Sequence, residues 1–269
     1  MEGLYKAPKN SHKGQNGRLL IIGGSKKYHG APMLSIFGAR RFVDLIYFFP
    51  GEKDQKLINS IGTIPEVIVL EKIEEKEHYD CVLIGVGLGE NNVDIEKIAK
   101  KSTKIIVDGD GLKLQVKFLP KSSLANEIEG QSTLNEKGEI LQKVLVFPKN
   151  CIITPHEGEF RMLFGIDGSK ENVEKMAKKY SITILKKGAV DIISDGKKTK
   201  ENKIHNQGMT KGGTGDVLAG LVCALSCKND NFKAAFEGAR ICGKAGNLCK
   251  KEFGLNFCAS DLAEKLARV

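Results

Sequence analysis

The sequence contains no tryptophan, no CxxC pair and no apolar run of about 20 residues. We therefore do not expect a membrane span. Nucleic-acid binding is not expected either, because its modules combine basic patches with aromatic side chains and only 6% of these residues are aromatic. The seven cysteines are odd in number, and the chain opens on a polar, charged segment instead of a secretory signal. These features predict a cytoplasmic protein with reduced thiols.

The charge is unbalanced, with 42 lysines and arginines against 33 acidic residues and a net charge of +9. The plainer explanation is a well-hydrated, lysine-rich surface. The alternative is the attraction of an anionic ligand, a class that includes nucleotides. Composition leaves both explanations open.

Short apolar runs alternate with longer amphipathic segments, which is typical of a mainly parallel sheet covered on both faces. The predicted strands are 18–22, 45–49, 66–70, 81–84, 104–107, 144–147, 151–154 and 182–186, followed by a hairpin of 191–194 and 198–203. The predicted helices are 31–42, 92–101, 158–164, 172–180, 216–227, 232–253 and 260–267. No repeat or flexible linker divides the chain, so we expect a single α/β domain over 1–269.

The run Gly212-Gly213-Thr214-Gly215-Asp216 leads directly into an apolar helix. Glycines let successive N–H groups face an anion closely, and the helix N-terminus adds a partial positive charge. The sequence therefore predicts a phosphate site here. Asp216 is either the N-cap of that helix or a general base that activates a hydroxyl for attack on phosphorus. An acidic residue is poorly placed for anion binding alone, which favours the base.

A second motif, Thr154-Pro155-His156-Glu157-Gly158-Glu159-Phe160, follows a predicted strand, where open α/β sheets bind ligands. Taken alone, it is explained best by helix capping, with Thr154 at the cap and acidic residues in the first turn. The alternative is functional, with His156 contacting a substrate and Glu159 binding Mg²⁺ or its water.

Other strand ends carry weaker signals. The turns Gly23-Gly24-Ser25 and Gly85-Val86-Gly87-Leu88-Gly89 lack the spacing of a dinucleotide fingerprint, and there is no P-loop lysine pattern. Asp108 and Asp110 are explained more readily as turn formers than as ligand contacts. Lys187 follows a strand, where it would either neutralise a nucleotide phosphate or lie solvated.

Taken in order along the chain, these motifs resemble the ADP- or ATP-dependent NAD(P)H-hydrate dehydratases of the ribokinase-like superfamily. The resemblance rests above all on Thr154–Phe160 and on Gly208-Met209…Gly212-Gly213-Thr214-Gly215-Asp216-Val217-Leu218. It implies a three-layer α/β/α ribokinase-like fold. It also implies an activity, the repair of hydrated NADH or NADPH by phosphorylation of the added ring hydroxyl and elimination of phosphate. A small-molecule kinase acting on a vitamin precursor or sugar is the alternative within the same superfamily.

The resemblance also implies site residues, with Asp216 as the catalytic base and Mg²⁺ assisting. The positions that match the family's hydrated-cofactor contacts are Ala31, Gly89, His156 and Asp216. The positions that match its contacts to ADP or ATP are Lys187, Gly188, Ala189, Val190, Asp191 and Gly215. The predicted phosphate site adds Gly212, Gly213 and Thr214 to the nucleotide-binding residues.

The chain also departs from the family pattern. Val86 replaces a usual proline, and Val190-Asp191 replaces a more usual Gly-Thr, which puts the nucleotide contacts there in doubt. The stretch before Thr154 is longer than usual, so we expect an insertion within 113–150. The superfamily resemblance also implies a homo-oligomer, for example a tetramer.

Overall fold

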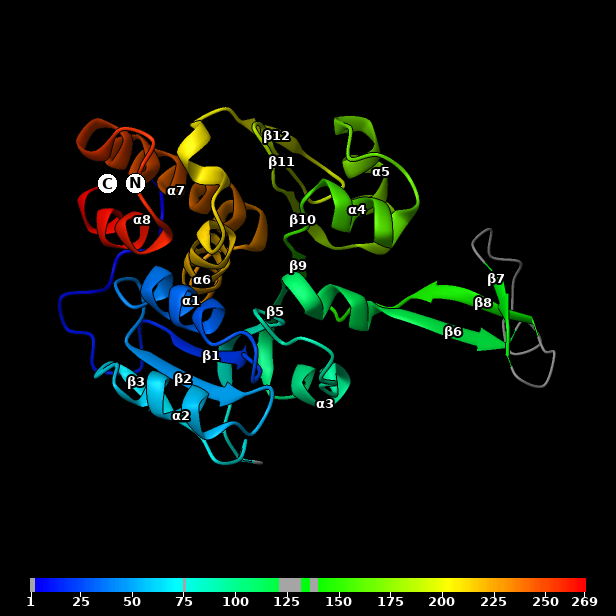
Figure 1. The fold of residues 1–269 in the computed structure, drawn as a ribbon, viewed down its shortest axis with the longest axis horizontal. Helices are drawn as coiled ribbons and strands as arrows, with labels where there is room; N and C mark the ends of the chain where they lie inside the picture. The colour runs from blue at the N-terminus through cyan, green and yellow to red at the C-terminus, as the bar shows by residue number, and fades with distance from the viewer. Residues whose placement is uncertain (1–2, 75, 121–131, 136–139) are drawn as a thin grey trace.

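A nine-stranded sheet forms the centre of the protein (Figure 1). The computed structural model describes residues 3–74, 76–120, 132–135 and 140–269. In spatial order, the strands are β12 (Thr199–Asn202), β11 (Asp191–Ser194), β10 (Thr183–Lys186), β9 (Cys151–Ile153), β5 (Ser102–Val107), β4 (Tyr79–Ile84), β1 (Arg18–Gly23), β2 (Leu45–Pro50) and β3 (Val67–Val69). From β10 to β3 all neighbours are parallel, whereas β10, β11 and β12 pair antiparallel.

Helices cover both faces of this sheet, and each face has its own apolar core. One core lies beneath α1 (Gly30–Ala39), α2 (Gln55–Gly62), α6 (Thr214–Ser226), α7 (Asn231–Phe253) and α8 (Ala259–Lys265). The other lies beneath α3 (Ile95–Ala99), α4 (Glu157–Phe164) and α5 (Lys170–Tyr180). Alternate strand residues point to opposite faces, so the apolar runs of the central strands fill both cores. The α/β class and the three layers predicted from the sequence are confirmed.

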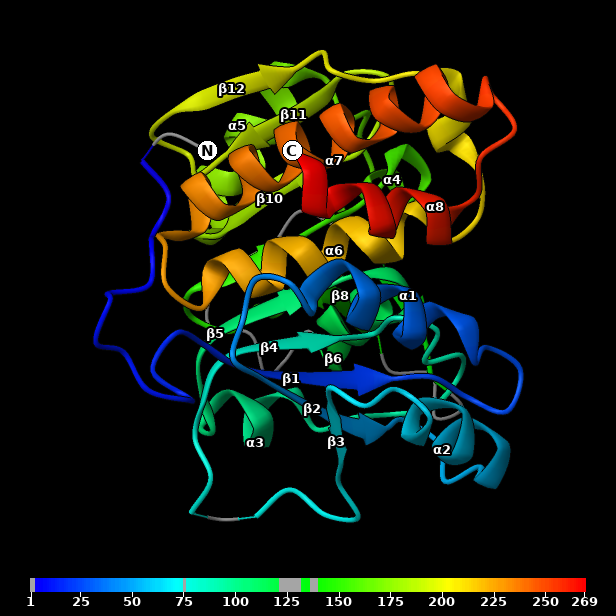
Figure 2. The same cartoon turned by 90° about the vertical axis from the view of Figure 1, so that its left-hand side faces the viewer.

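Helices α1 and α6 cross in close contact at glycines. A Cβ on Gly220 would overlap the carbonyl oxygen of Ser35, and one on Gly38 would overlap that of Val217. Both helices begin at the edge where the parallel strands end, on the right in Figure 2. The crossing therefore fixes the N-terminus of α6 relative to the strand ends.

A small antiparallel sheet projects from the body of the protein (Figure 1). It consists of β6 (Val116–Pro120), β8 (Ile140–Leu145) and β7 (Ser132–Leu134). The strand predicted over 144–147 was wrong in its bounds, because β8 covers Ile140–Leu145. This strand pairs with β6 and not with the central sheet. The segment lies within the expected insertion at 113–150, of which 121–131 and 136–139 fall outside the described residues. That this segment is an insertion, like the single domain over 1–269, stays a prediction.

The remaining elements agree with the sequence apart from their ends and one helix. Helix α2 was not predicted, although Asp54 caps it by accepting from the Leu57 N–H, and Leu57 and Ile61 are buried one turn apart. The predicted hairpin is present as β11 and β12. Within the described ranges, no helix is both long and apolar enough to span a bilayer.

The glycine crossing makes a testable claim about stability. We expect Gly220→Ala to lower the free energy of unfolding by about 1–3 kcal/mol or more, because the methyl group forces α1 and α6 apart. Gly62→Ala in α2 is the matched control: no atom lies within 4 Å of its Cβ position, so it should be neutral or stabilise by about 0.5–1 kcal/mol. Denaturant unfolding measures both, and equal effects of the two substitutions would contradict the close crossing.

Candidate active site

Three side chains converge where neighbouring parallel strands end. Asp108 follows β5, Thr154 follows β9 and Lys187 follows β10. Asp108 is only 3% exposed, and its Oδ1 accepts hydrogen bonds from Thr154 Oγ1 at 2.6 Å and from Lys187 Nζ at 2.7 Å. Residues 79 positions apart in the sequence thus form one buried ion pair.

The ammonium group of Lys187 is held in its charged form. Burial alone would lower the pKa of Lys187, but Asp108 and Glu159 outweigh that effect and the pKa is raised. The Nζ atom lies 3.5 Å from the position that a Cβ on Gly215 would take. Lys187 therefore brings a positive charge to the glycine turn, and the solvated strand end considered from the sequence is wrong.

The glycine turn opens α6 without a side-chain cap. Its N-cap residue is Gly213, with a positive φ of 91°, and the turn is held by Thr214 Oγ1, which donates to the carbonyl oxygens of Met209 and Lys211. No atom lies within 4 Å of a Cβ position at Gly212, so the turn faces open space. An uncapped helix start with free N–H groups fits an anion.

Asp216 is the third residue of α6, so the N-cap explanation is wrong for it. Its side chain lies in the electrostatic field of Asp108, Glu159 and Lys187. Burial raises its pKa to about 7, Asp108 and Glu159 raise it too, and Lys187 opposes them. A carboxyl group with a pKa near neutrality is suited to accept a proton in one step and release it in the next.

His156 and Glu159 form a capping box at the start of α4. The N–H groups of Gly158 and Glu159 donate to His156 Nδ1, and Glu159 Oε2 accepts from the His156 N–H at 2.8 Å. Helix capping with acidic residues in the first turn is therefore confirmed. The predicted cap residue was wrong: His156 is the cap, and the Thr154 hydroxyl donates to Asp108 instead. The His156 ring remains largely exposed, with Nε2 3.6 Å from Glu159 Oε1.

The predicted nucleotide loop is held by its own aspartate. Asp191 accepts from the Gly188 N–H at 3.1 Å and from Asn202 Nδ2 at 3.0 Å. This carboxylate thereby shapes the loop between β10 and β11, and the N–H of Gly188 is already bonded. Ala189 and Val190 lie in the same loop.

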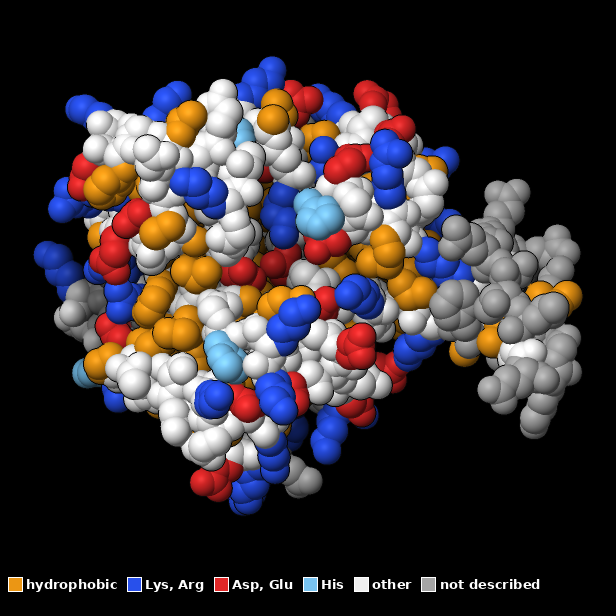
Figure 3. All heavy atoms as spheres, viewed as in Figure 1, with side chains coloured by type: hydrophobic (Ala, Val, Ile, Leu, Met, Phe, Trp, Pro, Cys, Tyr) orange, Lys and Arg blue, Asp and Glu red, His pale blue; other side chains and the backbone are white. Residues whose placement is uncertain are grey.

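Two further predicted contacts to the hydrated cofactor, Ala31 and Gly89, lie at the start of α1 and in the turn after β4. The Gly89 N–H donates to Asp110 Oδ2 at 2.8 Å. A Cβ on Gly87 would lie 2.9 Å from the Cβ of Ala31, so the turn after β4 packs against the start of α1. The structure thus gathers the predicted residues along one edge of the sheet. In Figure 3, acidic and basic side chains lie together in a hollow on this face.

Carboxylate oxygens are ligands that suit Mg²⁺, which is usually held by one or two carboxylates together with phosphates and water. Among the described residues, no group of three or more acidic, histidine or cysteine side chains is arranged to bind a metal by itself. The negative charges of Asp108 and Glu159, which both raise the pKa of Asp216, would nevertheless attract a cation that binds together with phosphate.

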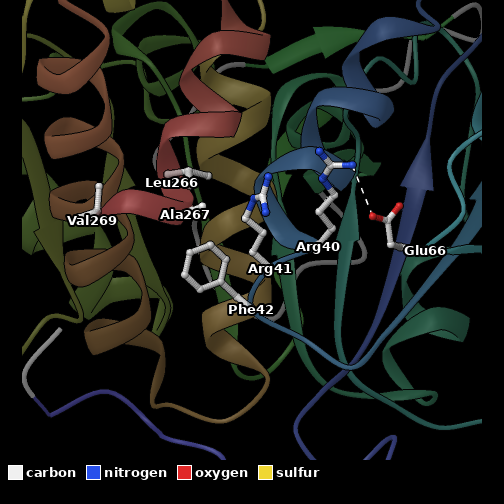
Figure 4. Close-up of a pocket in the computed structure, with 7 residues that line it drawn as sticks. All are labelled: Arg40, Arg41, Phe42, Glu66, Leu266, Ala267 and Val269. Carbon is white, nitrogen blue, oxygen red and sulfur yellow. Dashed lines mark ion pairs between the residues drawn. The ribbon is translucent and has the colours of Figure 1, made fainter. Parts of the chain in front are cut away.

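A separate hollow of about 570 Å³ lies at the opposite, C-terminal end of α1 (Figure 4). Arg40 forms ion pairs there with Glu66 and Glu264. Cations at a helix C-terminus complement its dipole, so these residues stabilise α1 and are separate from the site at its N-terminus.

Parallel strand ends, an uncapped helix N-terminus and a carboxylate on that helix form an edge of the kind at which α/β proteins bind phosphate ligands. The chain belongs to the NAD(P)H-hydrate dehydratase family, whose model matches residues 19–127 and 132–268.

Individual relatives agree with this assignment. The bifunctional NAD(P)H-hydrate repair enzyme of Methanocaldococcus jannaschii is 37% identical over 286 residues, covering 100% of this chain and 51% of the relative. The ADP-dependent (S)-NAD(P)H-hydrate dehydratase of Nitrosopumilus maritimus is 35% identical over 272 residues, covering 96% of this chain and 90% of the relative. The chain thus spans about half the length of the bifunctional relatives that it matches.

Solved structures support the fold. An ADP/ATP-dependent NAD(P)H-hydrate dehydratase from Bacillus subtilis, co-crystallized with ATP/Mg²⁺, superposes with a TM-score of 0.75 at 23% identity, covering 98% of this chain and 92% of that chain. A hydroxyethylthiazole kinase from Pyrococcus horikoshii is more distant, with a TM-score of 0.57 at 14% identity, covering 96% of this chain and 90% of that chain. The ribokinase-like fold is therefore confirmed.

The raised pKa of Asp216 predicts a cost in stability. Between its unfolded value of 3.8 and its folded value of about 7, the folded protein holds a proton that the unfolded chain lacks. Its contribution to stability therefore falls as the pH rises from about 4 to 7. We expect Asp216→Asn to stabilise the protein at pH 8 by on the order of 2–4 kcal/mol and to have little effect near pH 4, as measured by denaturant unfolding.

Asp44→Asn is the control with the opposite sign. Although burial opposes it, hydrogen bonds from Asn16 and Gly14 lower the pKa of Asp44, so its removal should destabilise the protein at pH 8. If Asp216→Asn instead destabilises the protein at pH 8, the pKa of Asp216 is not raised in the folded protein.

Proposed function

We propose that this protein is an ADP- or ATP-dependent dehydratase that restores NADH or NADPH from their hydrated forms. The observation that carries the proposal is Asp216, a carboxyl group with a pKa of about 7 beside an anion-binding helix start and a charged lysine. The choice of substrate is supported by two relatives of which this chain covers 91% and 90%, because both are named ADP-dependent (S)-NAD(P)H-hydrate dehydratase.

The reaction needs a proton acceptor at the added ring hydroxyl. Asp216 accepts that proton while the hydroxyl oxygen attacks the terminal phosphorus of the nucleotide, and ADP or AMP leaves. The N–H groups of the Gly212–Gly215 turn and the ammonium of Lys187 stabilise the charge on the transferred phosphoryl group. Phosphate then leaves from the ring carbon with the hydroxyl's oxygen, and loss of a proton from the adjacent carbon restores the double bond.

The remaining predicted residues take supporting roles in this proposal. Ala31, Gly89 and His156 contact the hydrated cofactor, and residues 187–191 contact the adenine nucleotide. Glu159 would hold Mg²⁺ through water, and the bound ion would neutralise phosphate charge. Homo-oligomeric assembly and a cytoplasmic location stay predictions.

The direct assay combines the protein with hydrated NADH, Mg²⁺ and either ADP or ATP. We expect the absorbance of the restored dihydronicotinamide to rise, and Asp216→Asn to lower the turnover by ~10²-fold or more, because the general base is lost. Asp195→Asn in the β11–β12 turn is the matched control and should retain full turnover, since among the described residues Asp195 bonds only within its own hairpin.

Two outcomes would contradict the proposal. If no NADH is restored and a pyrimidine or thiazole alcohol is converted to a stable phosphate ester, the protein is a small-molecule kinase. If Asp216→Asn is fully active while still binding nucleotide, Asp216 is not the base.

A further inference from the structure

Strands β2 and β3 lie at one end of the central sheet, and the helix that packs against both of them, α2, covers one side. On the other side of the sheet, the short helix α3 packs against β5. Val67 and Val69 of β3 pack towards the α2 side, so Ile68 between them points to the α3 side, where it is 42% exposed. This end of the sheet is therefore open on the α3 side.

A groove of about 1240 Å³ lies on the α3 side, between α3 and the chain that joins β3 to β4. Its apolar part consists of Phe49, Ile73 and Val93, which are half-buried at the margin of the core beneath α3. The groove is larger than the roughly 300–1,000 Å³ of a pocket for a small ligand. Its size suits a segment of polypeptide better than a small molecule.

Lysines from three segments of the chain line this groove. Lys53 follows β2, Lys76 lies between β3 and β4, and Lys97 and Lys100 lie in α3 and at its C-cap. All four are exposed, and within the described residues none of them forms an ion pair. The fold thus collects positive charge around an apolar surface.

The acidic side chains of the groove offset little of this charge. Glu77 and Glu96 each form an ion pair with a basic side chain that lies outside the groove. Asp94 accepts from a backbone N–H as the N-cap of α3. In the described part of the chain, Glu71 is then the one carboxylate of the groove without such a partner, against four unpaired ammonium groups.

We propose that this groove binds an extended, acidic segment of a partner protein. Successive side chains of an extended segment point to opposite sides, so its apolar residues lie on Phe49, Ile73 and Val93 while its carboxylates reach the lysines at the rim. A second copy of this chain fits less well, because it carries a net charge of +9 itself. The inference is independent of the proposed dehydratase activity.

Nucleic acid fits the groove less well than an acidic peptide. Its single strands are bound by basic grooves in which the bases stack on exposed aromatic rings, with arginine contributing to the stacking. The described lining contains no arginine, tryptophan or tyrosine, and its phenylalanine, Phe49, is half-buried. The apolar surface also has no counterpart on a phosphate backbone.

The test is fluorescence anisotropy of a short, fluorescein-labelled peptide in which glutamate and leucine alternate. We expect the protein to bind this peptide, and to bind the matched peptide with serine in place of leucine about tenfold more weakly, because the leucines lose contact with water. Ile73→Ser should weaken binding of the leucine peptide several-fold and leave the serine peptide unaffected. Added salt should weaken both complexes.

A groove variant removes the four unpaired lysines and carries Lys53→Gln, Lys76→Gln, Lys97→Gln and Lys100→Gln. It should bind the leucine peptide roughly tenfold more weakly or less, since several surface ion pairs are lost together. The matched control removes four exposed lysines outside the groove that also lack an ion pair among the described residues, by Lys175→Gln, Lys178→Gln, Lys197→Gln and Lys244→Gln. The control should bind the peptide nearly as the wild type does, and both variants should keep the wild-type Tm.

Several outcomes would overturn the proposal. It fails if the wild type does not bind the peptide, if both lysine variants lose affinity equally, or if the serine and leucine peptides bind equally well. A labelled single-stranded RNA that binds more tightly than the peptide, and is released by the groove substitutions, would assign the groove to nucleic acid. A wild type that sediments as an oligomer, with a groove variant that sediments as a monomer, would assign it to a second copy of the chain.

Discussion

The site depends on the burial of one carboxyl group, that of Asp216, near two other acidic side chains, Asp108 and Glu159, while the ammonium of Lys187 opposes their effect on its pKa. Lys187 forms its direct ion pair with Asp108, and its attraction for Asp216 does not outweigh the burial of Asp216 and the repulsion from the two acids. A proton on Asp216 relieves the repulsion. The burial and repulsion that cost stability also supply a proton acceptor near neutral pH, and the negative charge favours the cation that a phosphoryl-transfer reaction brings with its phosphates.

The fold produces this arrangement of charges by bringing distant segments of the chain to the edge of the sheet where the parallel strands end. Asp108 and Lys187 stand at the ends of parallel strands, where side chains from separate parts of the sequence meet. Asp216 comes from the opposite direction, on a helix whose position is set by the glycine contacts between α1 and α6. A change at Gly220, one helical turn after Asp216 on α6, would therefore move the base relative to Lys187.

Much of this arrangement follows from the sequence. The strand–helix alternation predicted the α/β class, and the order of the motifs predicted the family and the role of the glycine turn. The sequence did not reveal the importance of Asp108, because an aspartate at a strand end is common and its partner Lys187 is distant in the chain. The N-cap explanation for Asp216 failed for a similar reason, since the true cap, Gly213, has no side chain to recognise. Long-range pairing of charges is visible only once the strands are in register.

The central claim is that burial, together with its acidic neighbours, makes Asp216 a proton acceptor with a pKa of about 7. The most direct test is a ¹³C NMR titration of the aspartate carboxyl carbons in the protein without ligands, with the Asp216 resonance identified by its absence from the spectrum of Asp216→Asn. The account predicts that this resonance titrates near pH 7. A midpoint near the ordinary aspartate value of 3.8 would contradict it.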